Sequence, residues 1–348
     1  MDAGLLGLLC SQGPAPKAED VAGEKGEDAI ELVDQVVCGL RVAKVFRENT
    51  ETINSVDFNS GGDLMISAAD DDQIIIYDCE NGTIKRNLKS KKYGVSMIRF
   101  THSRNTVIHG STKIDDTIRY LSLYDNKYIR YFSGHTNKVT SLCMSATDDL
   151  FLSASLDKTL QLWDLRSPNC EGMMHLQGKP IAAFDPEGLI FAAGMNSECI
   201  KLYDLRSFDK GPFSSFRLPH EKYEWASLHF SPNGKQIMLT ITGSSMIRII
   251  DAFGGTPLHS MADHKPTQST YSPQACYSPD SKYIFMGAED GKIHVWNVET
   301  GHKVIILNGD HPRPLTCVQF NPKYMMMASA CTDMSFWLPK AQTQSKIP

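Results

Sequence analysis

The chain has 348 residues, of which 41% are hydrophobic and 22% charged, and a formal net charge of −5, values that are ordinary for a soluble globular protein. No apolar run approaches the roughly 18 residues of a membrane-spanning helix, which excludes that class of membrane protein. The nine cysteines form no C-x-x-C pair and several fall in predicted strands, which argues against a disulfide framework or a zinc site and for reduced thiols in a cytosolic or nuclear protein.

The first 40 residues carry most of the negative charge, with eight acidic residues and two lysines. They are rich in Gly, Ala and Glu and contain "GPAP", so we expect a mostly disordered acidic extension. Within it, "DAIELVDQVV" at 28–37 has the pattern of a short helix. That helix is either a nascent helix in a linker or a partner-binding motif.

The rest of the chain repeats one pattern. Seven strand-like segments, "IIIYD", "LSLYD", "LQLWD", "IKLYD", "IRIID", "IHVWN" and "MSFWL", recur 39–47 residues apart. They end at Asp78, Asp125, Asp164, Asp204, Asp251, Asn297 and Leu338. Most units hold three short strand-like runs and then a fourth, separated by turn residues, which is the pattern of a propeller blade. We predict an all-β, seven-bladed β-propeller at 41–340, followed by a short tail at 341–348.

The last blade needs a strand from elsewhere, because the chain stops soon after the seventh repeat. The segment "LRVAKVF" at 40–46 precedes the first complete unit and belongs to none. We expect it to pair into the last blade, so that both chain ends close the ring and cover an exposed sheet edge.

The third unit suggests why the pattern ends in an aromatic residue and an aspartate. It contains four residues that resemble the structural tetrad of the WD-repeat family: His135, Ser153, Asp157 and Trp163. In that family the four side chains hydrogen-bond one another, as a buried indole and imidazole require. The seventh unit offers an equivalent set: His311, Ser329, Asp333 and Trp337. The first unit keeps Ser67 and Asp71, with Tyr77 in place of Trp.

The sequence offers no pattern typical of catalysis. Motifs for phosphate-binding loops, dinucleotide binding, nucleophile elbows and helical zinc sites are missing, and the eleven histidines are scattered. We therefore predict a protein that is not an enzyme and that needs no cofactor or metal. Acidic clusters at 70–73 and 113–117 are read either as polar turns or as a cation site.

A basic cluster, "IKRNLKSKKYG", suggests a partner surface. Its last lysines should share one rim of the propeller with lysines from neighbouring loops, and the predicted partner-binding residues are Lys91, Lys92, Lys113, Lys138, Lys158 and Lys179. One reading is a docking site for an acidic or phosphorylated peptide. The other is a charged blade edge that resists strand pairing. Binding to duplex DNA is not expected, because residues 41–348 hold 33 basic and 32 acidic residues.

Several longer stretches of the sequence are more specific than the short residue pattern that recurs from blade to blade. They include "RVAKVFREN" at 41–49, "KIDDTIRYLSLYDNKYIRYFSGH" at 113–135 and "KLYDLRSFDKGPF" at 201–213. Together they resemble the WD-repeat-containing protein 82 family, and the resemblance covers essentially all of 41–340. The extension at 1–40 departs from the family pattern, and residues 219–246 match it less well.

The resemblance implies a non-catalytic subunit of the Set1-type (COMPASS) histone H3 lysine-4 methyltransferase complex, located on chromatin in the nucleus. It implies binding to the Ser-5-phosphorylated tail of RNA polymerase II. It also implies a complex with protein phosphatase 1 and its nuclear targeting subunit, linked to transcription termination. Methyl transfer and dephosphorylation are expected to reside in those partners, and no membrane is implied.

A second function remains open from the sequence. Two motifs resemble the box with which WD-repeat substrate receptors engage the adaptor of a cullin-RING ubiquitin ligase. They are formed by Trp163, Asp164 and Arg166, and by Tyr203, Asp204 and Arg206. In the leading hypothesis these arginines merely brace their blades.

Overall fold

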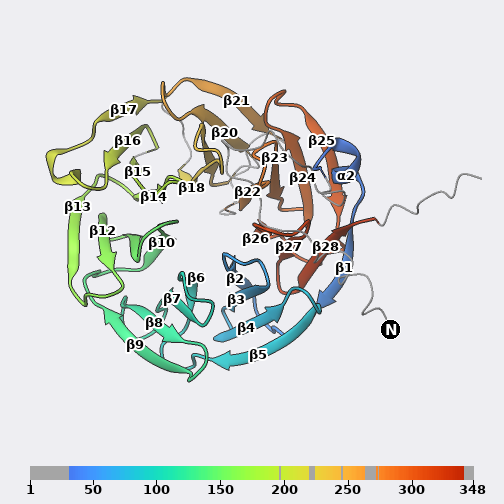
Figure 1. The fold of residues 1–348 in the computed structure, drawn as a ribbon, viewed down its shortest axis with the longest axis horizontal. Helices are drawn as coiled ribbons and strands as arrows, with labels where there is room; N and C mark the ends of the chain where they lie inside the picture. The colour runs from blue at the N-terminus through green and yellow to red at the C-terminus, as the bar shows by residue number, and fades with distance from the viewer. Residues whose placement is uncertain are drawn as a thin grey trace, which may run out of the picture.

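The structure is a computed structural model that describes residues 31–195, 197–218, 224–243, 246–262, 272 and 274–340. The predicted tail at 341–348 and most of the acidic extension lie outside these ranges. The described chain forms seven four-stranded antiparallel sheets arranged as blades around a central axis (Figure 1). The predicted seven-bladed β-propeller is confirmed. None of the described helices is long and apolar enough to cross a membrane.

The blades follow one another along the chain, and each runs from its inner to its outer strand. Blade 1 contains β2 (Ile53–Phe58), β3 (Leu64–Ala69), β4 (Gln73–Asp78) and β5 (Thr83–Lys89). Blade 2 contains β6 (Ser96–Phe100), β7 (Thr106–Gly110), β8 (Ile118–Ser122) and β9 (Lys127–Phe132). Blade 3 contains β10 (Val139–Met144), β11 (Leu150–Ser155), β12 (Thr159–Asp164) and β13 (Cys170–His175).

The remaining blades repeat this order. Blade 4 contains β14 (Ile181–Phe184), β15 (Ile190–Met195), β16 (Cys199–Asp204), the short helix η1 (Phe208–Lys210) and β17 (Ser214–Arg217). Blade 5 contains β18 (Trp225–Phe230), β19 (Gln236–Ile241), β20 (Met246–Asp251) and β21 (Pro257–Ala262). Blade 6 contains β22 (Ala275–Tyr277), β23 (Tyr283–Gly287), β24 (Lys292–Asn297) and β25 (Lys303–Asn308). Blade 7 contains β26 (Cys317–Phe320), β27 (Met327–Ala330), β28 (Met334–Pro339) and β1 (Leu40–Phe46).

Blade 7 is closed by the two ends of the folded chain. Strand β1 pairs antiparallel with β28, from Leu40 opposite Pro339 to Phe46 opposite Met334. The rings of Phe46 and Phe336 lie 5.1 Å apart, and that of Tyr77 in blade 1 lies 4.9 Å from Phe46. The closing strand therefore also fills the core between the last blade and the first.

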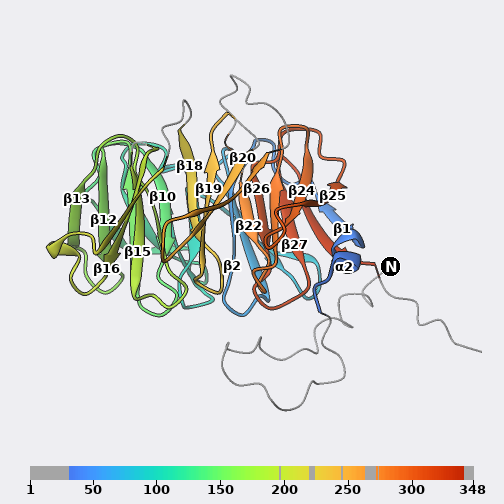
Figure 2. The same cartoon turned by 90° about the horizontal axis from the view of Figure 1, so that it is seen from above.

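The folded unit begins earlier than the predicted residue 41. A short helix, α2 (Asp34–Cys38), lies beside β25 of blade 6 (Figures 1 and 2). Val37 is fully buried there and Leu32 is nearly so, and the Tyr283 hydroxyl donates a 2.6 Å hydrogen bond to Asp34. These contacts make the segment after residue 30 part of the propeller. The prediction missed this because it weighed the acidic composition of 1–40 above three apolar side chains, Leu32, Val36 and Val37, that are buried in the structure.

The predicted end of the repeat in blade 2 was wrong by three residues. Strand β8 ends at Ser122, and Tyr124 of the "LSLYD" string lies in the following turn with 76% of its surface exposed. Leu121 takes the buried position that Trp163 holds in blade 3, since it pairs with Val107 as Trp163 pairs with Phe151. Tyr124 and Asp125 have the residue types that end the third strand in other blades, but here they lie in the turn that follows the strand.

Because strands within a blade alternate in direction, the loops separate onto two faces of the ring, which Figure 2 shows edge-on. We use "upper face" for the face that holds the loops between blades and those between second and third strands. The "lower face" holds the two remaining turns of each blade.

Candidate interaction surface

The third blade holds a chain of hydrogen bonds that runs from its core to the upper face. The Trp163 indole N–H donates to the Ser153 hydroxyl at 2.9 Å, and that hydroxyl lies 2.7 Å from Nε2 of His135. Nδ1 of His135 lies 2.9 Å from a carboxylate oxygen of Asp157. The carboxylate can only accept, so Nδ1 carries the proton and Nε2 accepts from Ser153. The four predicted tetrad residues of this blade are thus bonded in series.

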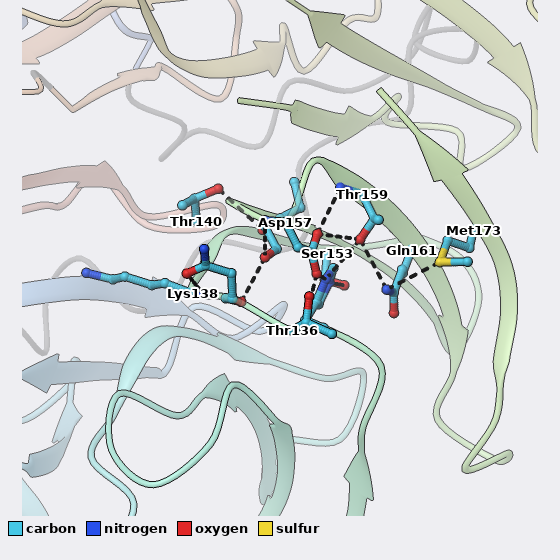
Figure 3. A network of polar contacts seen from close by, with 12 residues as sticks. Thr136, Lys138, Thr140, Ser153, Asp157, Thr159, Gln161 and Met173 are labelled. Carbon is cyan, nitrogen blue, oxygen red and sulfur yellow. Dashed lines mark hydrogen bonds and ion pairs between the residues drawn. The ribbon is translucent and has the colours of Figure 1, made fainter. Parts of the chain in front are cut away.

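The outer end of this chain fixes two loops. Figure 3 shows the Asp157 carboxylate at the centre of contacts with Thr136 and Thr159. Burial acts to raise the pKa of Asp157, but the hydrogen bonds from Thr159, Thr136 and His135 outweigh it and hold the pKa at about 2. Thr136 belongs to the loop before β10, and Asp157 to the turn before β12. The aspartate therefore holds two neighbouring upper-face loops in fixed positions.

The predicted tetrad of blade 7 is only partly assembled. Ser329 accepts from the Trp337 indole at 2.7 Å and lies 2.7 Å from Nε2 of His311. Nδ1 of His311 faces the Cys331 sulfur at 3.3 Å. Asp333 instead pairs with Arg47. Trp337 follows Ser329 by eight residues, whereas Trp163 follows Ser153 by ten, so the connection between equivalent strand positions is two residues shorter in blade 7. Cys331 thereby takes the place beside His311 that Asp157 takes beside His135.

Blade 1 uses a different set. The Tyr77 hydroxyl lies 3.5 Å from Ser67, a long contact, and Asp71 accepts from the side chain of Asn49 and the backbone of Thr50. Asn49 thus occupies the place of the tetrad histidine. Its position before the first inner strand, equivalent to that of His135, was the signal that sequence reasoning overlooked.

The predicted lysines all lie in upper-face loops. We call the set the lysine rim: Lys91, Lys92, Lys113, Lys138, Lys158 and Lys179. Lys91, Lys138 and Lys158 are exposed, and Lys138 extends away from the Asp157 network (Figure 3). Lys113 pairs with Asp72 of blade 1, and Lys179 is half-buried. Lys92 is exposed as well, so the exposed lysines of the rim lie in loops of blades 1 to 3.

Carboxylates of both acidic clusters accept hydrogen bonds or form ion pairs with other groups of the protein. Asp71 accepts from Asn49, Thr50 and Gln73, Asp72 pairs with Lys113, and Asp115 with Arg119. Among the described residues no group of three or more His, Cys, Asp or Glu side chains could hold a metal ion. These hydrogen bonds fit the reading of both clusters as polar turns.

The two arginine boxes lie on the lower face. Arg166 and Arg206 each contact the aspartate two residues earlier, Asp164 at 2.7 Å and Asp204 at 3.2 Å. Both guanidinium groups are largely exposed, so the pairs are weak by themselves. Each arginine is thus bonded to the aspartate of its own turn through its backbone N–H and its guanidinium group.

The central channel contains a cavity of about 280 Å³ between the inner strands, with Cys276 and Cys317 in its wall. Burial raises the pKa of each thiol to about 12. Both sulfurs are therefore protonated at neutral pH and are poor nucleophiles.

Three histidines, of which His109 is fully buried and His229 and His311 are partly buried, should make the fold sensitive to mild acid. Burial lowers the pKa of His109, His229 and His311 to about 4 in each case. The unfolded chain takes up these protons near pH 6.5, so their stabilising contribution is complete above that pH and is lost as the pH falls toward 4. At about pH 5.5 we expect each histidine to cost on the order of 1 kcal/mol of unfolding free energy.

Urea unfolding at a series of pH values measures this loss. A His109→Gln variant should show a shallower fall between pH 7 and 5 than the parent, because one titrating site is removed. His175 is exposed and provides the control, since His175→Gln should keep the parent's slope. Equal slopes for all three proteins would show that buried histidines do not set the pH dependence.

Comparison with known proteins agrees with the fold. The family model "WD domain, G-beta repeat" matches residues 126–164 and 255–297, and "Anaphase-promoting complex subunit 4 WD40 domain" matches 34–103. WD repeat-containing protein 82 of Drosophila melanogaster is 62% identical over 314 residues, which is 90% of this chain and 98% of that protein. The chain belongs to the WD repeat-containing protein 82 family. The resemblance predicted from the sequence strings is thereby confirmed.

Two yeast relatives cover most of the chain at lower identity. "Set1 complex component swd2" of Schizosaccharomyces pombe is 35% identical over 82% of this chain and 92% of its own length. "COMPASS component SWD2" of Saccharomyces cerevisiae is 33% identical over 82% of this chain and 90% of its own length. The similarity thus extends over most of each chain.

Proposed function

We propose that this protein is a non-catalytic scaffold subunit of a Set1-type histone H3 lysine-4 methyltransferase complex, associated with chromatin in the nucleus. The observation that carries the proposal is the match, over most of both chains, to two yeast proteins whose names place them in the Set1 and COMPASS complexes. A rigid ring with loops on two faces suits a subunit that holds several proteins together. Methyl transfer is the task of its partners.

The lysine rim supports a second part of the proposal, which is recognition of the Ser-5-phosphorylated tail of RNA polymerase II. Phosphate oxygens form strong, charge-assisted hydrogen bonds with lysine ammonium groups. The tetrad of blade 3 holds the loops of Lys138 and Lys158 in place, which reduces the entropy lost on binding. From the family resemblance we also infer a complex with protein phosphatase 1 and its nuclear targeting subunit, active in transcription termination.

Combined replacement of Lys91, Lys138 and Lys158 by alanine should weaken binding of a Ser-5-phosphorylated tail peptide about tenfold or more at low salt. The unphosphorylated peptide should bind both proteins weakly. Fluorescence anisotropy at several salt concentrations measures the affinity, and the variant should also show a smaller salt dependence.

The matched control replaces three exposed lysines of the lower face, Lys210, Lys235 and Lys323. It removes the same net charge from the opposite side of the ring and should retain the parent's affinity. Equal weakening by both triple variants would mean that net charge, and not the lysine rim, governs binding.

A further inference from the structure

The second blade presents an unusual amount of exposed apolar surface. Twelve large apolar side chains are exposed among the described residues, and four of them lie in blade 2: Ile114 (74%), Tyr124 (76%), Ile129 (49%) and Tyr131 (47%). Contiguous exposed apolar side chains of this size mark interaction sites, whereas single ones are ordinary. The question is which of these four form one surface.

Tyr131 and Ile114 are joined through Arg119 and Tyr93. The Arg119 guanidinium lies 5.1 Å from the Tyr131 ring and 3.5 Å from the Tyr93 ring. The Tyr93 carbonyl accepts the backbone N–H groups of Thr112 and Lys113, which attaches the loop that carries Ile114. These contacts place the residues at one corner, where blade 2 meets the loop from blade 1. We call the set of Tyr93, Ile114, Arg119 and Tyr131 the blade-two corner.

Arg119 makes this corner rigid. Its side chain is 3% exposed, and its guanidinium donates two hydrogen bonds to Asp115 at 2.9 and 2.7 Å. Its Nε donates to the Ser111 hydroxyl at 2.8 Å. Both ends of the Ile114 loop are therefore bonded to the group that supports the two tyrosines. Rigid aromatic side chains give contact area at a small entropic cost, which favours their use in binding.

Ile114 is held in a strained conformation. Its φ of 72° lies in the left-handed region, and it is the one β-branched side chain among the described non-glycine residues with positive φ. Such a conformation is a genuine outlier for isoleucine. The side chain points into solvent and contributes little to the core, so the strain has no evident benefit to folding. Strain of this kind concentrates at binding sites, where it positions a contact group.

Lysines adjoin Tyr93 at this corner, and Asp116 follows Ile114 by two residues. The Lys92 ammonium lies 4.8 Å from the Tyr93 ring, and Lys89 and Lys91 are exposed beside it. Arg119 is neutralised by Asp115 and Lys113 by Asp72, so neither adds net charge. Lysines next to an exposed aromatic surface favour a ligand that combines an apolar group with carboxylates.

We propose that the blade-two corner docks an extended segment of a partner protein, in which an aromatic or aliphatic side chain is flanked by aspartate or glutamate. The apolar side chain packs on Tyr93, Tyr131 and Ile114, and the carboxylates reach Lys91 and Lys92. Carboxylates and not phosphates are the proposed anions. The proposal goes beyond the scaffold function and does not depend on which complex the protein joins.

A displayed library of random short peptides, selected on the full chain, tests this without knowledge of the partner. We expect enriched peptides to contain an aromatic or large aliphatic residue next to Asp or Glu. A representative synthetic peptide should bind Ile114→Gly and Tyr131→Ala at least about tenfold more weakly than the parent. Replacing its acidic residues by Asn and Gln should also weaken binding.

The Ile114→Gly variant separates binding from folding. Glycine adopts the positive φ without strain, so this variant should unfold at or above the parent's temperature while it loses affinity. The matched control is Phe253→Ala, which removes from blade 5 an aromatic side chain about as exposed as that of Ile114 (78% against 74%). It should bind the peptide as the parent does.

The proposal is overturned if no peptide is enriched, if the enriched peptides lack acidic residues, or if the Ile114→Gly and Tyr131→Ala variants bind them like the parent. A preference for phosphoserine over glutamate in the same peptide would also contradict it. The Lys138→Ala, Lys158→Ala double variant leaves the corner intact and should keep the affinity. Lys91 is shared by the two proposals, so Lys138 and Lys158 on one side and Ile114 and Tyr131 on the other separate them. Peptides that bind the Ile114→Gly and Tyr131→Ala variants like the parent would overturn the corner and leave the phosphopeptide proposal standing.

Discussion

Replacing Ser153 by alanine should lower the free energy of unfolding by about 3 kcal/mol, although only one oxygen is removed. The hydroxyl accepts from the Trp163 indole and donates to His135, and it is fully buried. Its loss leaves two buried polar groups without their partner, and each such group costs about 1–3 kcal/mol. Equilibrium urea unfolding of the purified protein measures the difference.

Ser67→Ala provides the matched control. Ser67 occupies the same position in blade 1 and is equally buried, but its 3.5 Å contact with Tyr77 is long. We expect this variant to lose less than about 1 kcal/mol. If the two variants are equally destabilised, burial of the hydroxyl and not the tetrad sets the cost.

Deleting residues 1–46 should abolish cooperative folding, whereas deleting residues 1–30 should leave the unfolding transition unchanged. The longer deletion removes the buried side chains of Val37, Leu40 and Phe46 and exposes the edge of β28. These three side chains alone contribute about 5–9 kcal/mol. That is most of the roughly 5–15 kcal/mol that stabilises an ordinary fold.

Thermal unfolding and size-exclusion chromatography of the two truncated proteins test this. A synthetic peptide of residues 31–47 provides the control, since adding it in trans should restore part of the folded signal to the longer deletion. A compact, cooperative protein lacking residues 1–46 would contradict the role assigned to β1 in closing the ring.

The blade pattern could be predicted from the sequence because it depends on local features that recur. An apolar run ending in an aromatic residue and a turn residue marks the end of the third strand in most blades, and "LQLWD" ends β12 at Asp164 as predicted. The same rule failed in blade 2, where Tyr124 and Asp125 follow the strand. A short-range pattern cannot distinguish a strand end from a turn of similar composition.

Side-chain partners were harder to predict, because they depend on loop length. Asp333 has the residue type of a tetrad member, but the tight turn after β27 gives its place to Cys331. Helix α2 was misjudged for a different reason: the prediction followed the acidic composition of the segment, whereas in the structure Val36 and Val37 pack into a cluster with apolar residues of blade 6. The blade-two corner escaped prediction because Tyr93, Ile114 and Tyr131 are brought together by Arg119, which no sequence spacing reveals.

Affinity purification of the tagged full-length chain from nuclear extract, with mass spectrometry of the bound proteins, tests the central claim most directly. The scaffold proposal predicts recovery of Set1-type methyltransferase subunits, and the second assembly predicts protein phosphatase 1 with its targeting subunit. Recovery of a cullin adaptor as the main partner, with both of those assemblies absent, would contradict the proposed function and favour a role for Arg166 and Arg206 in ligase binding.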